Sequence, residues 1–181
     1  MHRNPFLRLL SDYEKRHPDE IEVVTRFREF VQTHEDCFER SLEIGHLTGS
    51  AWISNADNSA VFLTHHRKLD KWLQPGGHAD GDSDMLAVAL KEADEETGLN
   101  PIKPVSTAIL DLDIHPIPAR KSDPEHLHFD VRFALRHTGD GSYIVSEESH
   151  DLAWVPLGNL KSYTDEISIL RMKRKFTEMV S

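Results

Sequence analysis

The N-terminal part of the chain places apolar residues among polar ones with a helical spacing. Residues 5–16 are predicted to form a short helix, with Asn4 as N-cap and Pro5 at the first helical position. A second helix is predicted to begin at Pro18. Its apolar residues form one stripe: Val23, Val24, Phe27, Phe30 and Val31. This helical extension is expected to pack on the rest of the chain, and a homodimer contact or a cap over substrate are the alternatives.

The middle of the chain changes to patterns that are typical of strands. Residues 46–54 and 60–65 are rich in β-forming residues, and the Asn, Asp and Ser residues between them predict a hairpin turn. Later strands are predicted near 105–114, 126–136 and 151–156. A turn at 157–160 and a final helix at about 165–180 follow. This order predicts an α/β protein with a mixed sheet and helices on its faces.

A helix rich in acidic residues is predicted between residues 83 and 97. Asp82 or Ser83 would be its N-cap, and Gly98 would supply a left-handed stop. The positions predicted to face the core are Leu86, Leu90, Ala93 and Thr97. The opposite face carries Glu92, Glu95 and Glu96. These like charges repel, and the helix dipole disfavours them near its C-terminal end. A hard divalent metal would neutralise them best, and a solvated acidic face is the alternative.

The run from Gly76 to Leu99 resembles the box of the Nudix hydrolases, G-x5-E-x7-R-E-U-x-E-E-x-G-U, where U is apolar. The segment Lys91–Leu99, KEADEETGL, matches every fixed position but one, and counting back places Gly77 on the first glycine. The resemblance implies a Nudix-like α/β/α sandwich with a mixed sheet and an N-terminal helical extension. We expect one domain over residues 1–181, with the extension at 1–44 and the catalytic core at 45–181.

The chain departs from the box at two positions. Lys91 stands where the family has arginine; lysine keeps the charge but lacks the planar fork, and it can still pair with Glu95 at i+4. Ser83 stands where the family has its first glutamate, and Asp82 or Asp84 could replace that carboxylate with a shorter reach. We expect a changed metal geometry or substrate preference, with loss of catalysis as the alternative.

The resemblance also implies which residues are catalytic and which bind metal. Glu95 and Glu96 match adjacent glutamates that bind metal in the family, and Glu92 matches one that assists with metal or with activation of water. The backbone carbonyl of Gly76 is implied as a further metal ligand. A last carboxylate is implied in the loop ahead of Trp154, where the candidates are Glu148 first and then Glu147. The implied cofactor is Mg²⁺ or Mn²⁺.

A second group of polar residues follows the strand predicted at 126–136. The residues that share one face are His126, His128, Asp130 and Arg132, opposite an apolar face that must belong to the core. We expect the polar face to line a substrate cleft together with His115 and Arg120, since arginine suits phosphate. Cross-strand ion pairs and solvent exposure are the alternatives. A zinc site formed by His78, His126 and His128 is another, although the three follow no recognised ligand spacing.

A basic loop at 66–73 leads into the two glycines of the box. It carries Arg67, Lys68 and Lys71, and His78 follows the glycines. We expect Arg67 and His78 to face a substrate phosphate. A solvated basic turn is the alternative for the loop.

Bulk properties limit the classes of function that remain. The chain of 181 residues is 38% hydrophobic and 29% charged, which is typical of a soluble globular protein. Its net charge of −10 argues against a broad nucleic-acid surface. No apolar run approaches the ~20 residues that span a bilayer. The single cysteine, Cys37, excludes an internal disulfide and favours a cytoplasmic location.

The function predicted from these residues is metal-dependent hydrolysis of a phosphoanhydride bond. The substrate would be a small-molecule diphosphate: a nucleoside diphosphate linked to another moiety, or a nucleoside triphosphate. A Nudix module that binds or senses a nucleotide without cleaving it is the alternative, favoured by Ser83 and Lys91. An isopentenyl-diphosphate isomerase has a related fold, but no cysteine lies near the Gly-Gly-His segment.

Overall fold

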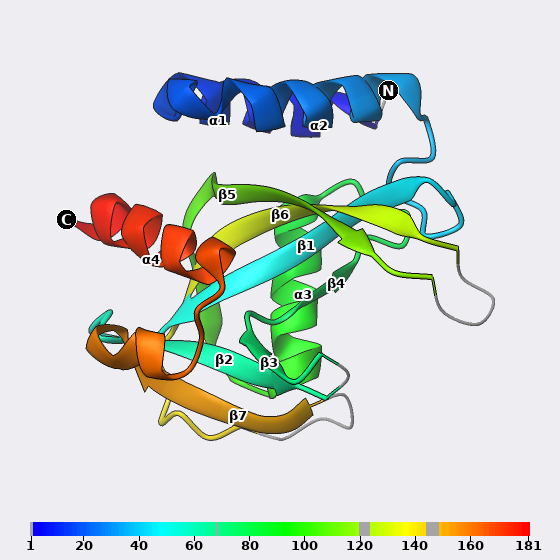
Figure 1. The fold of residues 1–181 in the computed structure, drawn as a ribbon. Helices are drawn as coiled ribbons and strands as arrows, with labels where there is room; N and C mark the ends of the chain where they lie inside the picture. Colours follow the sequence, from blue (N-terminus) through cyan, green and yellow to red (C-terminus); the bar gives the residue numbers. More distant parts are fainter. Residues whose placement is uncertain (1, 68, 120–123, 144–148) are drawn as a thin grey trace.

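The computed structural model describes residues 2–67, 69–119, 124–143 and 149–181 (Figure 1). The helices are α1 (Asn4–Arg16), α2 (Ile21–Thr33), α3 (Met85–Thr97) and α4 (Ile167–Val180), with short 3-10 helices η1 (Pro18–Glu20) and η2 (Leu157–Ser162). The strands are β1 (Gly45–Ser54), β2 (Ala60–His66), β3 (Lys71–Leu73), β4 (Gly76–His78), β5 (Ile102–Ile117), β6 (His126–His137) and β7 (Ser149–Pro156). Within these ranges, no helix combines the length and the apolar character needed to cross a membrane.

In the described part of the chain, seven strands form one mixed sheet. The path through it is β3-β2-β1-β6-β5, with β4 beside β1 and β7 beside β2. β1 and β6 are parallel, and the other pairs are antiparallel. The parallel register places His46 opposite His128 and Ser50 opposite Arg132. Because side chains alternate along a strand, these four residues lie on one face of the sheet. The mixed sheet with helices confirms the predicted fold class.

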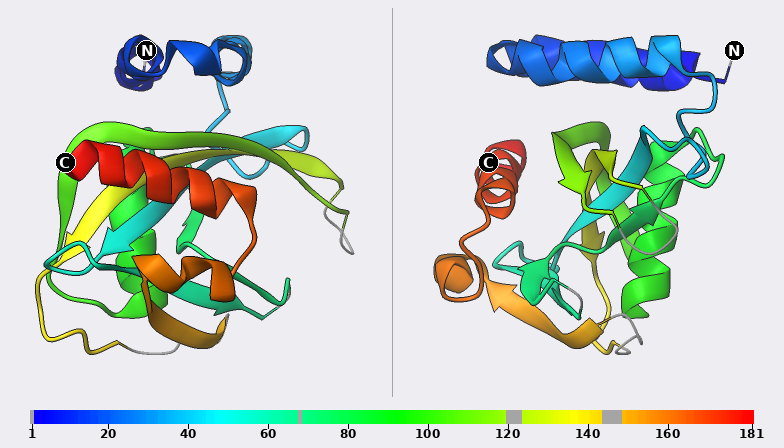
Figure 2. Two further views of the ribbon diagram at one scale, coloured as in Figure 1. Left: turned by 60° about the vertical axis from the view of Figure 1, so that its left-hand side comes forward. Right: turned by 45° about the vertical axis from the view of Figure 1, so that its right-hand side comes forward.

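Two apolar clusters fill the spaces between the sheet and its helices. One cluster joins α1, α2 and α3 to the sheet through residues such as Leu47, Phe129 and Val131. The other joins α4 to the opposite face, where Met172 and Phe176 pack with Trp52. Figures 1 and 2 show α3 and α4 on opposite sides of the sheet, with α1 and α2 side by side above β5 and β6. The layers are therefore those of an α/β/α sandwich with two added helices.

The N-terminal helices lie close to where the sequence predicts them. The N-cap of α1 is Arg3, however, with Asn4 already helical, and a 3-10 turn at Pro18–Glu20 comes before α2. The extension packs through its aromatic residues: Phe30 stacks on Phe129 of β6 with ring centroids 3.9 Å apart. This stacked pair joins α2 to the sheet. The division at residues 44 and 45 stays a prediction.

The remaining elements match the sequence in kind, with differences at their ends. The strands predicted at 46–54 and 60–65 are β1 and β2, and the three later strands and the final helix are also present. The short strands β3 and β4 fall in a stretch that was expected to be loop. Helix α3 begins at Met85 and its N-cap is Asp84, so the N-cap prediction of Asp82 or Ser83 is wrong. Gly98 ends α3 in the left-handed conformation, with φ of 64°, as predicted.

Candidate active site and histidine cluster

The glutamates of α3 lie against the two glycines of β4. A Cβ atom on Gly77 would stand 2.2 Å from Oε2 of Glu92, which is closer than real side chains approach. The N–H of Gly76 donates a hydrogen bond to Oε1 of Glu96, with a length of 3.2 Å. Glycine at position 77 therefore allows a carboxylate to reach the strand backbone, and the structure brings together the two parts of the box.

The glutamates also interact with their own helix. Nζ of Lys91 lies 3.5 Å from Oε1 of Glu92 and 3.8 Å from Oε2 of Glu95, so the predicted i,i+4 pair with Glu95 is confirmed. Burial raises the pKa of Glu92, Lys91 opposes this effect, and the charge of Glu95 adds to it. The ionised form of Glu92 is thus disfavoured where it stands, and a cation beside it would offset this. The Glu95 side chain is 58% exposed.

The aspartates beside Ser83 hold the start of α3. Oδ1 of Asp84 accepts a hydrogen bond from the N–H of Ala87 at 3.1 Å, and Oδ1 of Asp82 accepts one from the N–H of Asp84 at 2.9 Å. Both carboxylates serve local backbone groups at the helix N-terminus. This arrangement does not favour either as a replacement for the missing box glutamate. Glu148, its alternative Glu147, and Arg120 lie outside the described residues.

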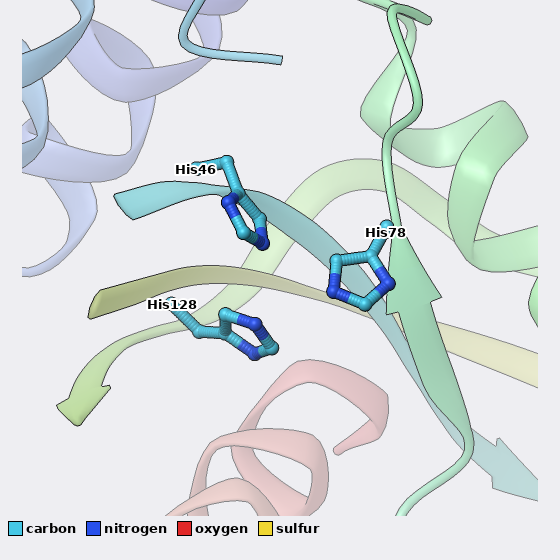
Figure 3. Close-up of side chains that lie close together, drawn as sticks. All are labelled: His46, His78 and His128. Atoms are coloured by element: carbon cyan, nitrogen blue, oxygen red, sulfur yellow. The ribbon is translucent and has the colours of Figure 1, made fainter. Parts of the chain in front are cut away.

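Three histidines from three strands meet on the face of the sheet that carries α4. They are His46 of β1, His78 of β4 and His128 of β6, and Figure 3 shows their rings turned toward one another. One ligand nitrogen from each can be chosen so that all lie within 4.8 Å of one another. The strand register explains the meeting, because His46 pairs with His128 and His78 pairs with Thr48, two residues from His46. The structure thus joins His78 and His128 with His46, where the sequence suggested His126 as the third member.

Two histidines of this cluster, His46 and His128, have lowered pKa values. Burial and then the nearby His78 lower the pKa of His46 to about 4, and the same two causes, with His46 third, lower the pKa of His128 to about 2. His46 is only 3% exposed. Among the described residues, neither ring nitrogen of His46 has a hydrogen-bond partner, nor does Nε2 of His128. Buried polar atoms normally have partners, so these orphaned nitrogens are unusual.

A family model described as NUDIX domain matches residues 46–176, which is more than half of the chain. The chain belongs to the NUDIX family. The enzyme class implied by the box, a Nudix-type pyrophosphohydrolase, is thereby confirmed at the level of the family. A search of the curated proteins found no match.

Solved structures of Nudix proteins share the fold at low sequence identity. An Ap4A hydrolase from C. elegans is 15% identical, with a TM-score of 0.56, over 75% of this chain and 98% of that one. A MutT protein from Methanosarcina mazei Go1 is 17% identical, with a TM-score of 0.55, over 76% and 96%. The NUDIX domain of Shewanella oneidensis NrtR, complexed with ADP ribose, is 16% identical, with a TM-score of 0.54, over 85% and 98%. At this identity the likeness is one of fold alone.

Two residues expected in the substrate cleft of this Nudix domain are buried in an ion-pair network. The Arg132 side chain is 3% exposed and lies 2.7 Å from Asp130, 3.1 Å from Asp111 and 3.2 Å from Asp113. Asp130 also accepts hydrogen bonds from Thr48, Ser50 and Gln74. The donors of Arg132 are thus surrounded by carboxylates, and contact of Arg132 or Asp130 with substrate stays a prediction. Cross-strand ion pairs, the alternative in the sequence analysis, describe this part of β6.

The same network ties the helical extension to α4. The buried Nζ of Lys175 lies 2.6 Å from Asp111 and 2.6 Å from Glu20, and it donates to the hydroxyl of Tyr13 at 2.5 Å. Burial alone would raise the pKa of Asp111, but the hydrogen bond from Arg171 and the charges of Arg132 and Lys175 outweigh it and lower the pKa. The cations therefore keep Asp111 ionised in the protein interior.

The other expected substrate residues that the structure describes are His115 of β5, His126 of β6 and Arg67 of the basic loop. His115 is paired with Asp113 at 3.1 Å and is 38% exposed. The Nδ1–H of His126 donates a hydrogen bond to the carbonyl oxygen of Pro124, with a length of 2.8 Å. Arg67 is exposed in the turn after β2. Contact of these residues with substrate stays a prediction.

His46 is the member of the candidate site that the sequence analysis missed. A signal for it exists, because His46, Thr48 and Ser50 alternate along β1 just as the polar residues alternate along β6. Pairing of these two strands in parallel could not be inferred from local patterns, since 82 residues separate His46 from His128 and no motif marks the register.

Proposed function

We propose that this protein hydrolyses a phosphoanhydride bond in a nucleoside diphosphate linked to another moiety, or in a nucleoside triphosphate. Mg²⁺ or Mn²⁺ would be held by Glu92, Glu95 and Glu96, with the Gly76 carbonyl and a carboxylate at Glu148 as further ligands. Family membership supports the reaction class. The Nudix neighbours named for Ap4A hydrolysis and for an ADP ribose complex support a nucleotide derivative as substrate.

The approach of Glu92 to Gly77 carries the proposal. The 2.2 Å separation between a Cβ on Gly77 and Oε2 of Glu92 means that glycine is required for this carboxylate position. The second contact, from Gly76 N–H to Glu96, fixes another carboxylate at the same strand. Carboxylate oxygens next to a strand backbone are the type of ligand that Mg²⁺ and Mn²⁺ prefer. The pKa of Glu92 is raised, and a bound cation would stabilise its ionised form.

Each residue of the set has a role that follows from its surroundings. A bound divalent metal would supply charge neutralisation at the phosphate and a lower pKa for an attacking water. Glu92, half-buried and beside Gly77, would accept the proton of that water or orient it. Glu95 and Glu96 would hold the cation, and Lys91 would keep Glu92 and Glu95 from turning away.

A second candidate function is nucleotide binding without cleavage. It is favoured by the start of α3, where Asp82 and Asp84 serve backbone groups and Ser83 brings no carboxylate. The site would then have one fewer oxygen ligand than the box specifies. A protein of this kind would bind a nucleotide and release no product.

A panel of diphosphate compounds, assayed with Mg²⁺ and with Mn²⁺, tests both candidates. The panel includes nucleoside triphosphates, dinucleoside polyphosphates and ADP-ribose, and the measured products are phosphate, pyrophosphate and nucleoside monophosphate. We expect turnover of at least one compound only with the metal present. The double variant Glu95→Gln/Glu96→Gln should lose about 10²–10³-fold or more in kcat.

The matched control is Asp94→Asn, which removes an exposed carboxylate from the same helix. It should keep wild-type activity, and circular dichroism should show the same fold for all variants. Full activity in the double variant would contradict the hydrolase proposal. Binding of a nucleotide by calorimetry, with no product from any compound, would favour the sensing candidate.

A further inference from the structure

A second group of candidate metal ligands lies on the other face of β4, away from the glutamates. Gly77 faces Glu92 on the α3 side of the strand. Side chains alternate along a strand, so the next residue, His78, points to the opposite side, where it meets His46 and His128. The histidine cluster and the glutamate cluster are therefore separate groups of ligands that share a strand of three residues.

The geometry points to a zinc site formed by His46, His78 and His128. Three imidazoles with one free position are a known ligand set for Zn²⁺. The ligand nitrogens all lie within 4.8 Å of one another. Zn–N bonds of about 2.0–2.1 Å would place them about 3.3 Å apart in a tetrahedron, so binding would draw the nitrogens together by up to about 1.5 Å.

Buried ring nitrogens without hydrogen-bond partners in His46 and His128 support this assignment. His46 is 3% exposed, and both of its ring nitrogens lack a partner among the described residues. Nε2 of His128 is buried and unpartnered as well. A neutral imidazole offers one lone pair, and a metal ion placed beside His46 and His128 would use lone pairs of these two rings that no donor satisfies.

The type of ligand selects the metal. Imidazole nitrogen suits zinc and its neighbours in the first transition row, whereas Mg²⁺ and Mn²⁺ prefer carboxylate and carbonyl oxygen. The two clusters should therefore take different ions. His126 is the nearest candidate for a fourth ligand, because its ring centroid lies 5.0 Å from that of His46 and 5.2 Å from that of His128. Water is the alternative in that position.

Metal binding to the full-length protein tests the proposal. The protein is stripped with a chelator and titrated with Zn²⁺ by calorimetry in the presence of excess Mg²⁺. We expect one Zn²⁺ per chain, and we expect it to remain in the triple variant Glu92→Gln/Glu95→Gln/Glu96→Gln. His46→Gln and His128→Gln should each weaken zinc binding by at least about 100-fold, since even outer-shell changes cost 10–100-fold.

The control variant is His137→Gln. His137 is equally buried, lies at the other end of β6 and also has an unpartnered ring nitrogen, so its loss tests whether any buried histidine on this strand matters. Zinc affinity should not change in this variant. Loss of zinc binding in the glutamate variant with retention in the histidine variants would overturn the proposal, and so would the absence of stoichiometric binding.

A measurement on the unmutated protein covers the case in which a histidine variant does not fold. X-ray absorption at the zinc edge should show three or four imidazole ligands, and Co²⁺ in place of Zn²⁺ should give the visible absorption of a tetrahedral nitrogen site. A shell made of oxygen alone would overturn the proposal. Because none of these readouts measures hydrolysis, a failure of the hydrolase proposal would leave the zinc result unaffected.

Discussion

Replacement of Gly77 by alanine should lower the catalytic rate while leaving the stability of the fold nearly unchanged. The new methyl carbon would stand 2.2 Å from Oε2 and 2.5 Å from Cδ of Glu92, and ordinary contact begins near 3.4 Å. The carboxylate must therefore move by about 1 Å, and a misplacement of about 1 Å in a catalytic group costs on the order of 100-fold in rate. That loss corresponds to about 2.7 kcal/mol of transition-state stabilisation.

The stability of the fold should change little in the same variant. The atoms that the methyl group meets belong to the end of a flexible side chain, so the backbone need not shift. Exchange of glycine for alanine at an unstrained position changes the free energy of unfolding by about 1 kcal/mol or less. We therefore expect kcat/KM to fall about 100-fold for the best substrate of the panel while the melting temperature stays within a few degrees.

Two comparisons make this experiment decisive. Gly158→Ala places a methyl group where nothing lies within 4 Å, and it should leave both activity and stability unchanged. The double variant Gly77→Ala/Glu92→Gln should lose little more activity than the more damaging of the two single variants, since both changes act through one carboxylate. Wild-type activity in Gly77→Ala, or a collapse of its stability, would refute the reasoning, as would full additivity with Glu92→Gln.

Three further predictions concern the charges that the hydrolase proposal does not use. Lys175→Met should lower the free energy of unfolding by about 3–5 kcal/mol in denaturant titrations, because it removes the buried cation beside Glu20 and one of the three cations beside Asp111. Arg174→Met, at an exposed pair, should change it by less than about 1 kcal/mol. The folded-state pKa values of Asp111 and Asp113 are lowered, so the ionised carboxylates contribute to the free energy of unfolding above the unfolded pKa of about 3.9, and this contribution is lost as pH falls below it. The free energy of unfolding, measured by denaturant titration, should therefore decline below about pH 4, and Asp113→Asn should make this decline with pH less steep. Arg132→Leu should impair folding more than it changes KM in any variant that folds, and a selective rise in KM with unchanged melting temperature would instead support a substrate contact.

The sequence predicted those parts of the fold that rest on local signals. The alternating residues of β1 and β6, the helical spacing of α3 and the left-handed stop at Gly98 each depend on neighbours a few residues away. The strands β3 and β4 have three residues each, too few to show a period. The sequence does not single out Asp84 as the N-cap of α3, because Asp82, Ser83 and Asp84 all carry side chains that can cap.

The polar face of β6 shows why the role of a residue is harder to predict than its orientation. The alternation correctly placed Arg132 and His128 on one face, but it could not show what covers that face. The partners of Arg132 are Asp111 and Asp113 of β5, and Arg171 and Lys175 of α4 share the same carboxylates. These cations and acids come from segments far apart in the chain, and only the packed structure brings them together. The same sequence pattern therefore forms a buried charge network at one end and a histidine cluster at the other.

The short strand β4 contributes residues to both candidate metal sites. Gly76 and His78 face the α4 side of the sheet, where a Cβ on Gly76 would meet Ser50 at 2.1 Å, and Gly77 faces Glu92 on the α3 side. Gln74, just before the strand, donates to Asp130 at 3.3 Å, and the carbonyl oxygen of Pro75 accepts a hydrogen bond from Ala51 at 2.9 Å. The strand is therefore held by the sheet and by the buried charge network before either cluster takes a metal. Because a strand exposes alternate residues to opposite faces, a sequence of two glycines and one histidine is enough to admit carboxylates on one side and to complete a nitrogen site on the other.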